Sequence, residues 1–233
     1  MSDVVPVDVD AVAARVAEVR DRIAAAGGDP QRVRLVAVTK GFGPDAVIAA
    51  HAAGVLDVGE GYAQEMAAKV EALADGPRPL HWHFVGRLQT NKVRLVAPSV
   101  DLWQSIDRDA VGDEVAKRSP GARVLVQVNV SGEAQKGGCE PGGTADLVAR
   151  LGELGLSVAG LMAIGPSGDP EASRPAFRAL RTLADDLGLA ERSMGMSDDL
   201  EIAVSEGATI VRVGRALFGS RPDPRSGTGR MRH

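Results

Sequence analysis

The feature that most constrains the fold of this 233-residue chain is a regular alternation of apolar, β-type runs with helical segments. Runs rich in apolar residues occupy 33–38, 55–59, 80–85, 100–106, 123–130, 157–164 and 209–213, and a further short strand is expected near 193–195. Helical segments lie between them, at residues 45–53, 62–74, 91–97, 109–117, 144–154, 170–187 and 197–206. Such alternation predicts parallel strands joined by crossover helices. About eight strands close an α/β barrel, and a doubly wound open sheet is the alternative for any repeat of this kind.

An additional helix precedes the first strand. Val9, Val12, Val16, Val19 and Ile23 recur at steps of three and four and form one apolar stripe. No linker or sequence repeat divides the chain, so we expect a single-domain modified (β/α)8 TIM barrel over residues 1–219. Residues 220–233 are rich in Arg, Pro, Gly and Ser and are predicted to be a disordered tail.

Composition narrows the class of protein. Hydrophobic residues make up 44% of the chain and aromatic residues only 3%, so the core must consist mostly of Ala, Val, Leu and Ile. The net charge of −4 and the lack of a clustered basic face do not predict a nucleic-acid partner. No apolar run is long enough for a membrane helix, and the acidic N-terminus does not resemble a signal peptide. With Cys139 as its one cysteine, the chain cannot form an intrachain disulfide, and this profile predicts a cytoplasmic protein. A monomer is expected because neither a second domain nor an apolar interface helix is evident.

Lys40 directly follows the first predicted strand. In α/β barrels and open sheets, ligands bind at the carboxyl ends of the strands, so this lysine is expected at the barrel mouth. An apolar wall there disfavours the charged form of the amine and frees its lone pair, as a Schiff-base lysine requires. The alternative is an ordinary surface lysine at the start of a loop.

The loops after the last two strands predict a phosphate site. Met196 and Ser197 follow the seventh strand, and Gly214 and Arg215 follow the eighth. Barrels often bind phosphate between these two loops, where helix N-termini offer unpaired N–H groups. Gly214 would permit close backbone approach, Ser197 would donate a hydroxyl, and Arg215 would add charge. The alternative for Ser197 is a plain helix N-cap.

Two polar residues lie inside predicted strands. A buried Arg212 in the last strand needs a partner, either an ion pair with Asp57 or Glu60 or the ring nitrogen of pyridoxal phosphate (PLP). His83 is interpreted as a polar residue of the mouth, near the cofactor, or as a satisfied core histidine. A metal site with His81 is not favoured, because no third ligand is evident.

The loop at residues 131–143 carries Lys136, Cys139 and several glycines. Its length and its place after a strand favour a lid, and a mobile surface loop is the alternative. The chain contains no P-loop, dinucleotide fingerprint or zinc signature.

Several strings occur together in a fixed order. They are Leu35-Val-Ala-Val-Thr-Lys40, Gly59-Glu-Gly-Tyr-Ala-Gln-Glu65, Trp82-His-Phe-Val-Gly86, Leu88-Gln-Thr-Asn-Lys92, Gly160-Leu-Met-Ala163, Gly195-Met-Ser-Asp-Asp199, and Val211-Arg-Val-Gly214 with Leu217-Phe-Gly219. In this order and spacing they resemble the pyridoxal phosphate homeostasis protein family (YggS/PROSC type). The resemblance extends from the first helix to Gly219.

The resemblance implies a barrel like the N-terminal domain of alanine racemase. It also implies a Schiff base at Lys40, ring-nitrogen contact by Arg212, phosphate contacts around Ser197 and Gly214, and a role in PLP homeostasis without established turnover. PLP is the expected partner, with PLP-dependent apo-enzymes as candidate recipients. The loop lysine, Lys136, matches one often seen in the family.

The chain departs from the family pattern at two positions. Members usually carry Asn where this chain has Gly61, so a side-chain contact to the cofactor is missing. Members often carry a small hydroxyl residue where this chain has Arg215.

Two other functions remain open from the sequence. A PLP-dependent racemase-like enzyme needs an acid/base group on each face of the substrate carbon. Barrel racemases bring the second one, a Tyr, from an additional domain, and the one Tyr here is Tyr62. A PLP-free phosphosugar-type enzyme would need a catalytic carboxylate at the mouth, for which Glu60 is the candidate.

Overall fold

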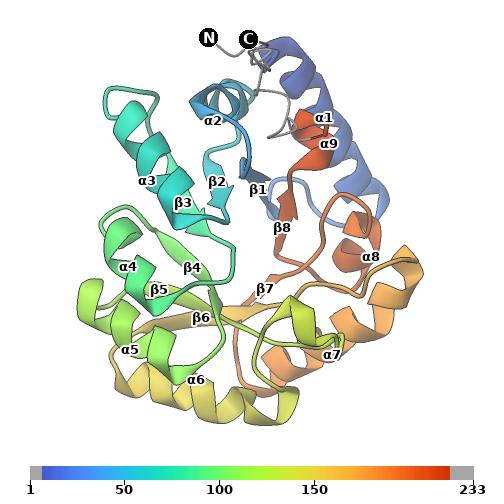
Figure 1. Ribbon diagram of the computed structural model, residues 1–233. Coiled ribbons are helices and arrows are strands. Elements are labelled where there is room, and N and C mark those ends of the chain that lie inside the picture. The colour runs from blue at the N-terminus through green and yellow to red at the C-terminus, as the bar shows by residue number, and fades with distance from the viewer. Residues whose placement is uncertain (1–6, 221–233) are drawn as a thin grey trace, which may run out of the picture.

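The computed structural model describes residues 7–220, and in it eight parallel strands close into a barrel in chain order (Figure 1). The strands are β1 Arg34–Val38, β2 Asp57–Glu60, β3 His81–Phe84, β4 Leu102–Ile106, β5 Arg123–Gln127, β6 Ser157–Met162, β7 Glu191–Ser193 and β8 Ile210–Val213. Because β8 pairs in parallel with β1, the predicted barrel is confirmed and the open sheet is excluded. Residues 220–233 were predicted to be a disordered tail, and all of them except Ser220 lie outside the described residues.

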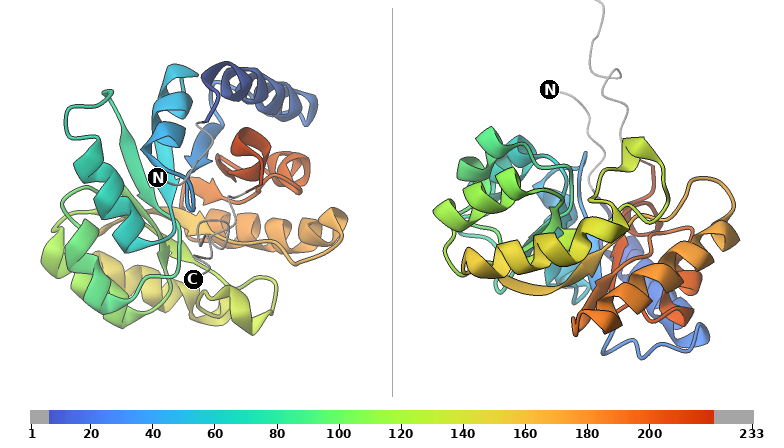
Figure 2. Two further views of the ribbon diagram at one scale, coloured as in Figure 1. Left: turned by 45° about the horizontal axis from the view of Figure 1, so that its top comes forward. Right: turned by 90° about the horizontal axis from the view of Figure 1, so that it is seen from below.

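Helices surround the barrel, as the two further views in Figure 2 show. They are α1 Val9–Ala25, α2 Pro44–Ala52, α3 Ala63–Ala72, α4 Thr90–Val96, α5 Asp109–Arg118, α6 Thr144–Glu153, α7 Ser173–Asp186, α8 Leu200–Ser205 and α9 Arg215–Phe218. Short 3₁₀ turns lie at Ala134–Lys136, Pro141–Gly143 and Pro170–Ala172. The predicted N-terminal helix is α1, which packs against α2, α8 and α9.

The first helix forms where the sequence pattern predicts it. Its stripe of Val12, Val16, Val19 and Ile23 is buried. Asp8 caps its N-terminus, accepting hydrogen bonds from two backbone N–H groups of the first turn, and such a cap contributes about 1 kcal/mol.

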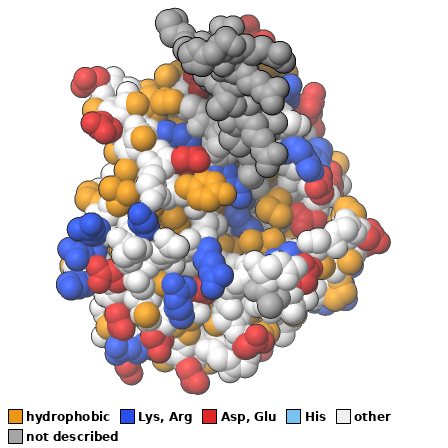
Figure 3. All heavy atoms as spheres, viewed as in Figure 1, with side chains coloured by type: hydrophobic (Ala, Val, Ile, Leu, Met, Phe, Trp, Pro, Cys, Tyr) orange, Lys and Arg blue, Asp and Glu red, His pale blue; other side chains and the backbone are white. Residues whose placement is uncertain are grey.

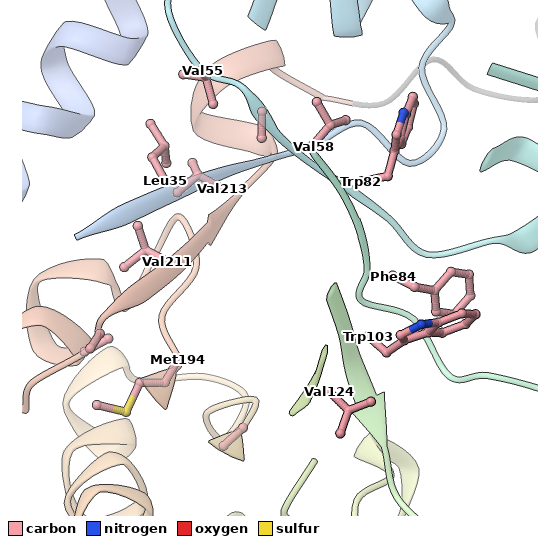
Figure 4. Close-up of a cluster of buried hydrophobic side chains, with 14 of the residues drawn as sticks. Leu35, Val55, Val58, Trp82, Phe84, Trp103, Val124, Met194, Val211 and Val213 are labelled. Atoms are coloured by element: carbon pink, nitrogen blue, oxygen red, sulfur yellow. The ribbon is translucent and has the colours of Figure 1, made fainter. Parts of the chain in front are cut away.

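Alternate residues of each strand face the barrel interior or the surrounding helices. The outward layer is mostly apolar, and Figure 4 shows part of it, with Trp82 and Phe84 on β3 and Trp103 on the neighbouring β4. The inward layer contains a small apolar cluster of Val36, Leu102, Leu125, Met162 and Ile210. Polar residues fill the rest of the interior, and this division determines what the barrel mouth can hold.

Candidate functional site

A cavity of about 430 Å³ lies where β1, β7 and β8 end, and we call it the Lys40 cavity. This volume is typical of small-molecule sites. Its lining is Val38, Lys40, Phe42, Val85, Ile164, Met196, Ser197, Asp198, Arg212, Gly214, Arg215, Gly219 and Ser220. Six of the seven residues predicted to bind a cofactor therefore share one cavity, although they are far apart in the sequence.

Lys40 is held at the rim of the barrel by a buried ion pair beneath it. The Lys69 ammonium donates a hydrogen bond of 2.8 Å to the carbonyl of Thr39 and lies 3.1 Å from Glu60 Oε1. Thr39, Glu60 and Lys69 are all buried. The pair therefore fixes the backbone directly before Lys40.

Burial of this ion pair disfavours the charged form of Glu60. Burial raises its pKa to about 7, and the nearby Lys69 opposes that rise. Its second oxygen, Oε2, has no hydrogen-bond partner within the described part of the chain. Glu60 does not line the Lys40 cavity, so it is poorly placed to act as the catalytic carboxylate of a phosphosugar-type enzyme.

Arg212 lies in the floor of the Lys40 cavity and is 5% exposed. Its guanidinium donates to Ser193 Oγ at 2.6 Å and to the carbonyl of Ala163 at 2.8 Å. Burial lowers its pKa to about 10, so the group keeps its charge at neutral pH. The alternative of an ion pair with Asp57 or Glu60 is not what the structure has, because neutral oxygens, and not those carboxylates, hold the guanidinium.

A chain of hydrogen bonds continues from Arg212 through the barrel interior. The Ser193 hydroxyl donates to Gln104 Oε1 at 2.6 Å. The Gln104 amide lies 2.6 Å from His83 Nδ1, and His83 Nε2 lies 2.9 Å from Asp57 Oδ1. Since the Gln104 amide donates to Nδ1, the His83 proton must be on Nε2 and point to Asp57. Arg212 is thus oriented by four residues from four different strands.

His83 is therefore not a residue of the mouth. It is 2% exposed, lies beneath the Lys40 cavity, and is absent from its lining. Both ring nitrogens have partners, as in the alternative interpretation of a satisfied core histidine. It could influence a ligand only through Gln104, Ser193 and Arg212. The cofactor contact predicted for His83 has no direct geometric support.

The loops after β7 and β8 are joined to one another. Ser197 Oγ accepts a hydrogen bond of 3.1 Å from the backbone N–H of Ala216. A Cβ on Gly214 would lie 3.0 Å from the Val38 carbonyl, so glycine permits the close approach of this loop to the end of β1. The two predicted phosphate loops thus meet beside Lys40.

The prediction that Ser197 opens a helix is wrong. Helix α8 begins at Leu200, and its N-cap is Asp199. The Asp199 carboxylate instead accepts from the backbone N–H of Met196 at 2.7 Å, which bends the loop into the cavity wall. Arg215 forms an ion pair with Asp198, and both side chains are more than 60% exposed. Its charge is therefore partly neutralised within the wall of the cavity.

The predicted lid is tied back to the barrel. Lys136 pairs with Glu133 at 3.0 Å and also donates to the carbonyl of Gly165. Cys139 pairs with the end of β5, where its backbone N–H donates to the Gln127 carbonyl at 2.9 Å. This loop covers the side of the barrel near β5 and β6, and it does not line the Lys40 cavity.

Sequence reasoning missed Lys69, Gln104 and Ser193. A lysine on the buried face of a helix was the available signal for Lys69, because Met66 and Leu73 share that face. Gln104 is a polar residue within an otherwise apolar strand, and such a residue needs a buried partner. Ser193 gave no distinct signal.

Residues 7–220 contain no group of three or more His, Cys, Asp or Glu side chains arranged to hold a metal ion. None of the helices in this range is both long and apolar enough to cross a membrane.

Comparison with known proteins gives a consistent result. Residues 7–222 match the family model described as alanine racemase, N-terminal domain. The pyridoxal phosphate homeostasis protein of Pseudomonas aeruginosa is 46% identical over 213 residues, covering 88% of this chain and 92% of its own. The protein of the same name from Escherichia coli is 39% identical over 228 residues, covering 90% and 97%.

Solved structures agree with this comparison. PipY of Synechococcus elongatus, solved with PLP bound, is similar with a TM-score of 0.75 and 33% identity, over 86% of this chain and all of that one. Alanine racemase of Streptomyces coelicolor shares the fold, with a TM-score of 0.71 and 23% identity, over 95% of this chain and 61% of its own.

Proposed function

The chain belongs to the pyridoxal phosphate homeostasis protein family, and from this we propose that it holds PLP as a Schiff base on Lys40 and serves PLP homeostasis, with no established catalytic turnover. The observation that carries the proposal is the shared cavity, which brings Lys40, Arg212 and the two joined loops around one volume. When bound, PLP supplies an aldehyde that condenses reversibly with a lysine amine. The PLP-bound PipY structure supports this choice of ligand.

Each part of the cavity suits one part of PLP. Ser197 and the backbone around Gly214 would bind the phosphate, with Arg215 adding charge at the rim. Met196 and Ile164 add apolar surface to the wall. Arg212 would donate a hydrogen bond to the ring nitrogen, as its partly unused guanidinium allows.

The arginine also affects the kind of chemistry the site supports. A guanidinium that keeps its proton cannot protonate the ring nitrogen, so the ring remains a weak electron sink. A weak electron sink favours holding the cofactor over breaking bonds at an amino-acid α-carbon. For this reason we place a carrier ahead of the racemase-like enzyme.

The proposal extends to the setting of the protein. We propose a cytoplasmic monomer that releases PLP to PLP-dependent apo-enzymes. The half-buried thiol of Cys139, the one cysteine of the chain, suits a reducing compartment.

The test is the visible absorption spectrum of the purified protein with added PLP. We expect a yellow protein whose added mass stays on the Lys40 peptide after borohydride reduction. Lys40→Ala should lose the band, whereas Lys117→Ala, at an exposed position in α5, should keep it. A colourless protein, or a label on another lysine, would contradict the proposal. Turnover of single amino acids by the yellow protein would favour the racemase-like alternative.

A further inference from the structure

Lys40 also lines a second cavity, on the side of the barrel toward α3 and α4. This cavity has a volume of about 610 Å³, and we call it the Tyr62 cavity. Its lining is Lys40, Gly61, Tyr62, Ala63, Gln64, Phe84, Gly86, Arg87, Leu88, Gln89, Lys92 and Arg108. The proposed function uses none of these residues except Lys40.

The charges around the Tyr62 cavity are all positive. Four of its lining residues are Lys or Arg, and the lining contains no Asp or Glu. Figure 3 shows several Lys and Arg side chains, with Asp and Glu side chains among them, on the side of this face that carries α3, α4 and α5. Arg108 is balanced by Asp107 at 2.5 Å. Arg87 and Lys92, in contrast, form no ion pair with any residue of the described range 7–220.

Several surface arginines, in contrast, have a carboxylate partner. Arg22 is 2.6 Å from Glu201, and Arg118 is 2.8 Å from Glu114. Two unbalanced cations beside a concave surface create a positive potential that concentrates anions. Their combined charge matches that of a phosphate monoester, which carries about −1.5 to −2 at neutral pH.

The rest of the cavity is suited to a small ring. Phe84 and Leu88 provide a buried apolar floor, and the Tyr62 side chain, 56% exposed, provides an aromatic wall. Aromatic surface of this kind packs well against a flat, unsaturated group. The cavity therefore combines an anion-binding part with an apolar part.

Gly61 allows the Tyr62 cavity to reach Lys40. A Cβ at this position would lie 3.1 Å from Lys40 Cδ and 3.8 Å from Lys40 Cβ. Any larger side chain at position 61 would therefore crowd the stem of Lys40. With glycine present, the lysine stem borders both cavities.

We propose that the Tyr62 cavity is a second ligand site, separate from the cavity assigned to PLP, that binds a small phosphate monoester carrying an apolar ring. Arg87 and Lys92 bind the phosphate, and Phe84, Leu88 and Tyr62 contact the ring. This site depends on the charges and shape of the cavity, and it does not require the Schiff base on Lys40.

The test uses protein whose PLP has been fixed by borohydride reduction, so that the Lys40 cavity is filled. Phenyl phosphate is titrated at low ionic strength in a calorimeter, with inorganic phosphate and benzoate as separate arms. We expect one equivalent of phenyl phosphate to bind, more tightly than either comparison ligand. Arg87→Gln and Lys92→Gln should each weaken binding by about tenfold, because each removes a charge-assisted hydrogen bond. The control is Arg94→Gln, an exposed position of α4 outside the cavity, which should change the affinity by less than about twofold.

The outcomes separate the alternatives. Absence of binding, an equal loss in Arg94→Gln, or benzoate binding as tightly as phenyl phosphate would each overturn the proposal. If PLP does not react with Lys40, the proposed function fails, and the same titration is made on the untreated protein. A loss confined to Arg87→Gln and Lys92→Gln in that protein would still support the second site.

Discussion

Replacing Glu60 with glutamine should change how the stability of the fold depends on pH. Glu60 is fully buried beside Lys69, and its pKa is about 7 in the folded chain, compared with 4.5 for an unperturbed carboxyl group. Between these two values the folded state binds more protons than the unfolded state. The stability contributed by protonated Glu60 is therefore complete below about pH 4.5 and is lost as the pH rises through about 7.

The magnitude follows from the difference between the two pKa values. At about 1.4 kcal/mol for each pKa unit, the loss between the acidic and alkaline limits is at most about 3–4 kcal/mol. Glu60→Gln keeps the shape of the side chain and does not titrate. The wild type should therefore lose stability relative to Glu60→Gln as the pH rises from 5 to 8.

The assay is urea unfolding of both proteins at closely spaced pH values, analysed by linear extrapolation. Glu153→Gln, a change at an exposed carboxylate of α6, serves as the control for loss of a negative charge. The difference in unfolding free energy between wild type and Glu60→Gln should shift mainly between pH 5 and pH 7. A difference that stays constant across this range would refute the reasoning about buried Glu60.

Three further predictions concern other parts of the barrel. Gln104→Leu should lower the unfolding free energy by about 2–4 kcal/mol in urea unfolding, because it leaves two buried polar partners unsatisfied; a loss below about 0.5 kcal/mol would contradict the role given to this residue. Gly160→Ala should destabilise by at least about 1–3 kcal/mol, because a Cβ there would lie 1.9 Å from the Glu191 carbonyl. Gly152→Ala, in α6 with no heavy atom within 4 Å, should instead stabilise by about 0.5–1 kcal/mol, and equal melting temperatures for the two variants would be inconsistent with this packing. Burial raises the pKa of the Cys139 thiol, so alkylation at pH 8 should be slower than that of a free thiol, and an equal rate would show that the thiol is exposed.

Much of the fold could be predicted because its signals are local. Most strands are short apolar runs, and the buried stripe of α1 follows from steps of three and four between apolar residues. An exception is β7, Glu191–Ser193, which was predicted at residues 193–195 and has no apolar run of its own. The strand from Arg123 was predicted to reach residue 130 but ends at Gln127. The run of alternating residues continues, and Val128 still donates to the Met162 carbonyl of β6, but from there the backbone pairs with Cys139, a contact that no local pattern reports.

The location of the site could be predicted from the sequence, but the hydrogen-bond partners of its residues could not. Lys40, Ser197 and Gly214 follow strands, and strand ends meet at one edge by topology. The protein partners of Arg212, Ser193 and Ala163, were not foreseen, because they depend on which inward-facing side chains become neighbours across the barrel. Ser193 and Gln104 are 89 residues apart in the chain and yet are bonded at 2.6 Å. Pairings of this kind require the register of several strands at once.

The hydrogen-bond chain from Arg212 to Asp57 has a direction. In each of its hydrogen bonds, the donor is the residue nearer to Arg212 and the acceptor is the residue nearer to Asp57. The chain begins with the Arg212 cation at the mouth and ends with the Asp57 carboxylate toward the opposite end of the barrel. The barrel interior therefore contains an aligned row of side-chain dipoles, comparable to the peptide dipoles of a helix. Asp57 is 22% exposed and lies 3.8 Å from Arg34, at the end of the barrel farthest from Lys40. A change of charge at that remote surface would therefore be transmitted along the row to the guanidinium, so the end of the barrel opposite the mouth can tune the polarity of whatever Arg212 binds.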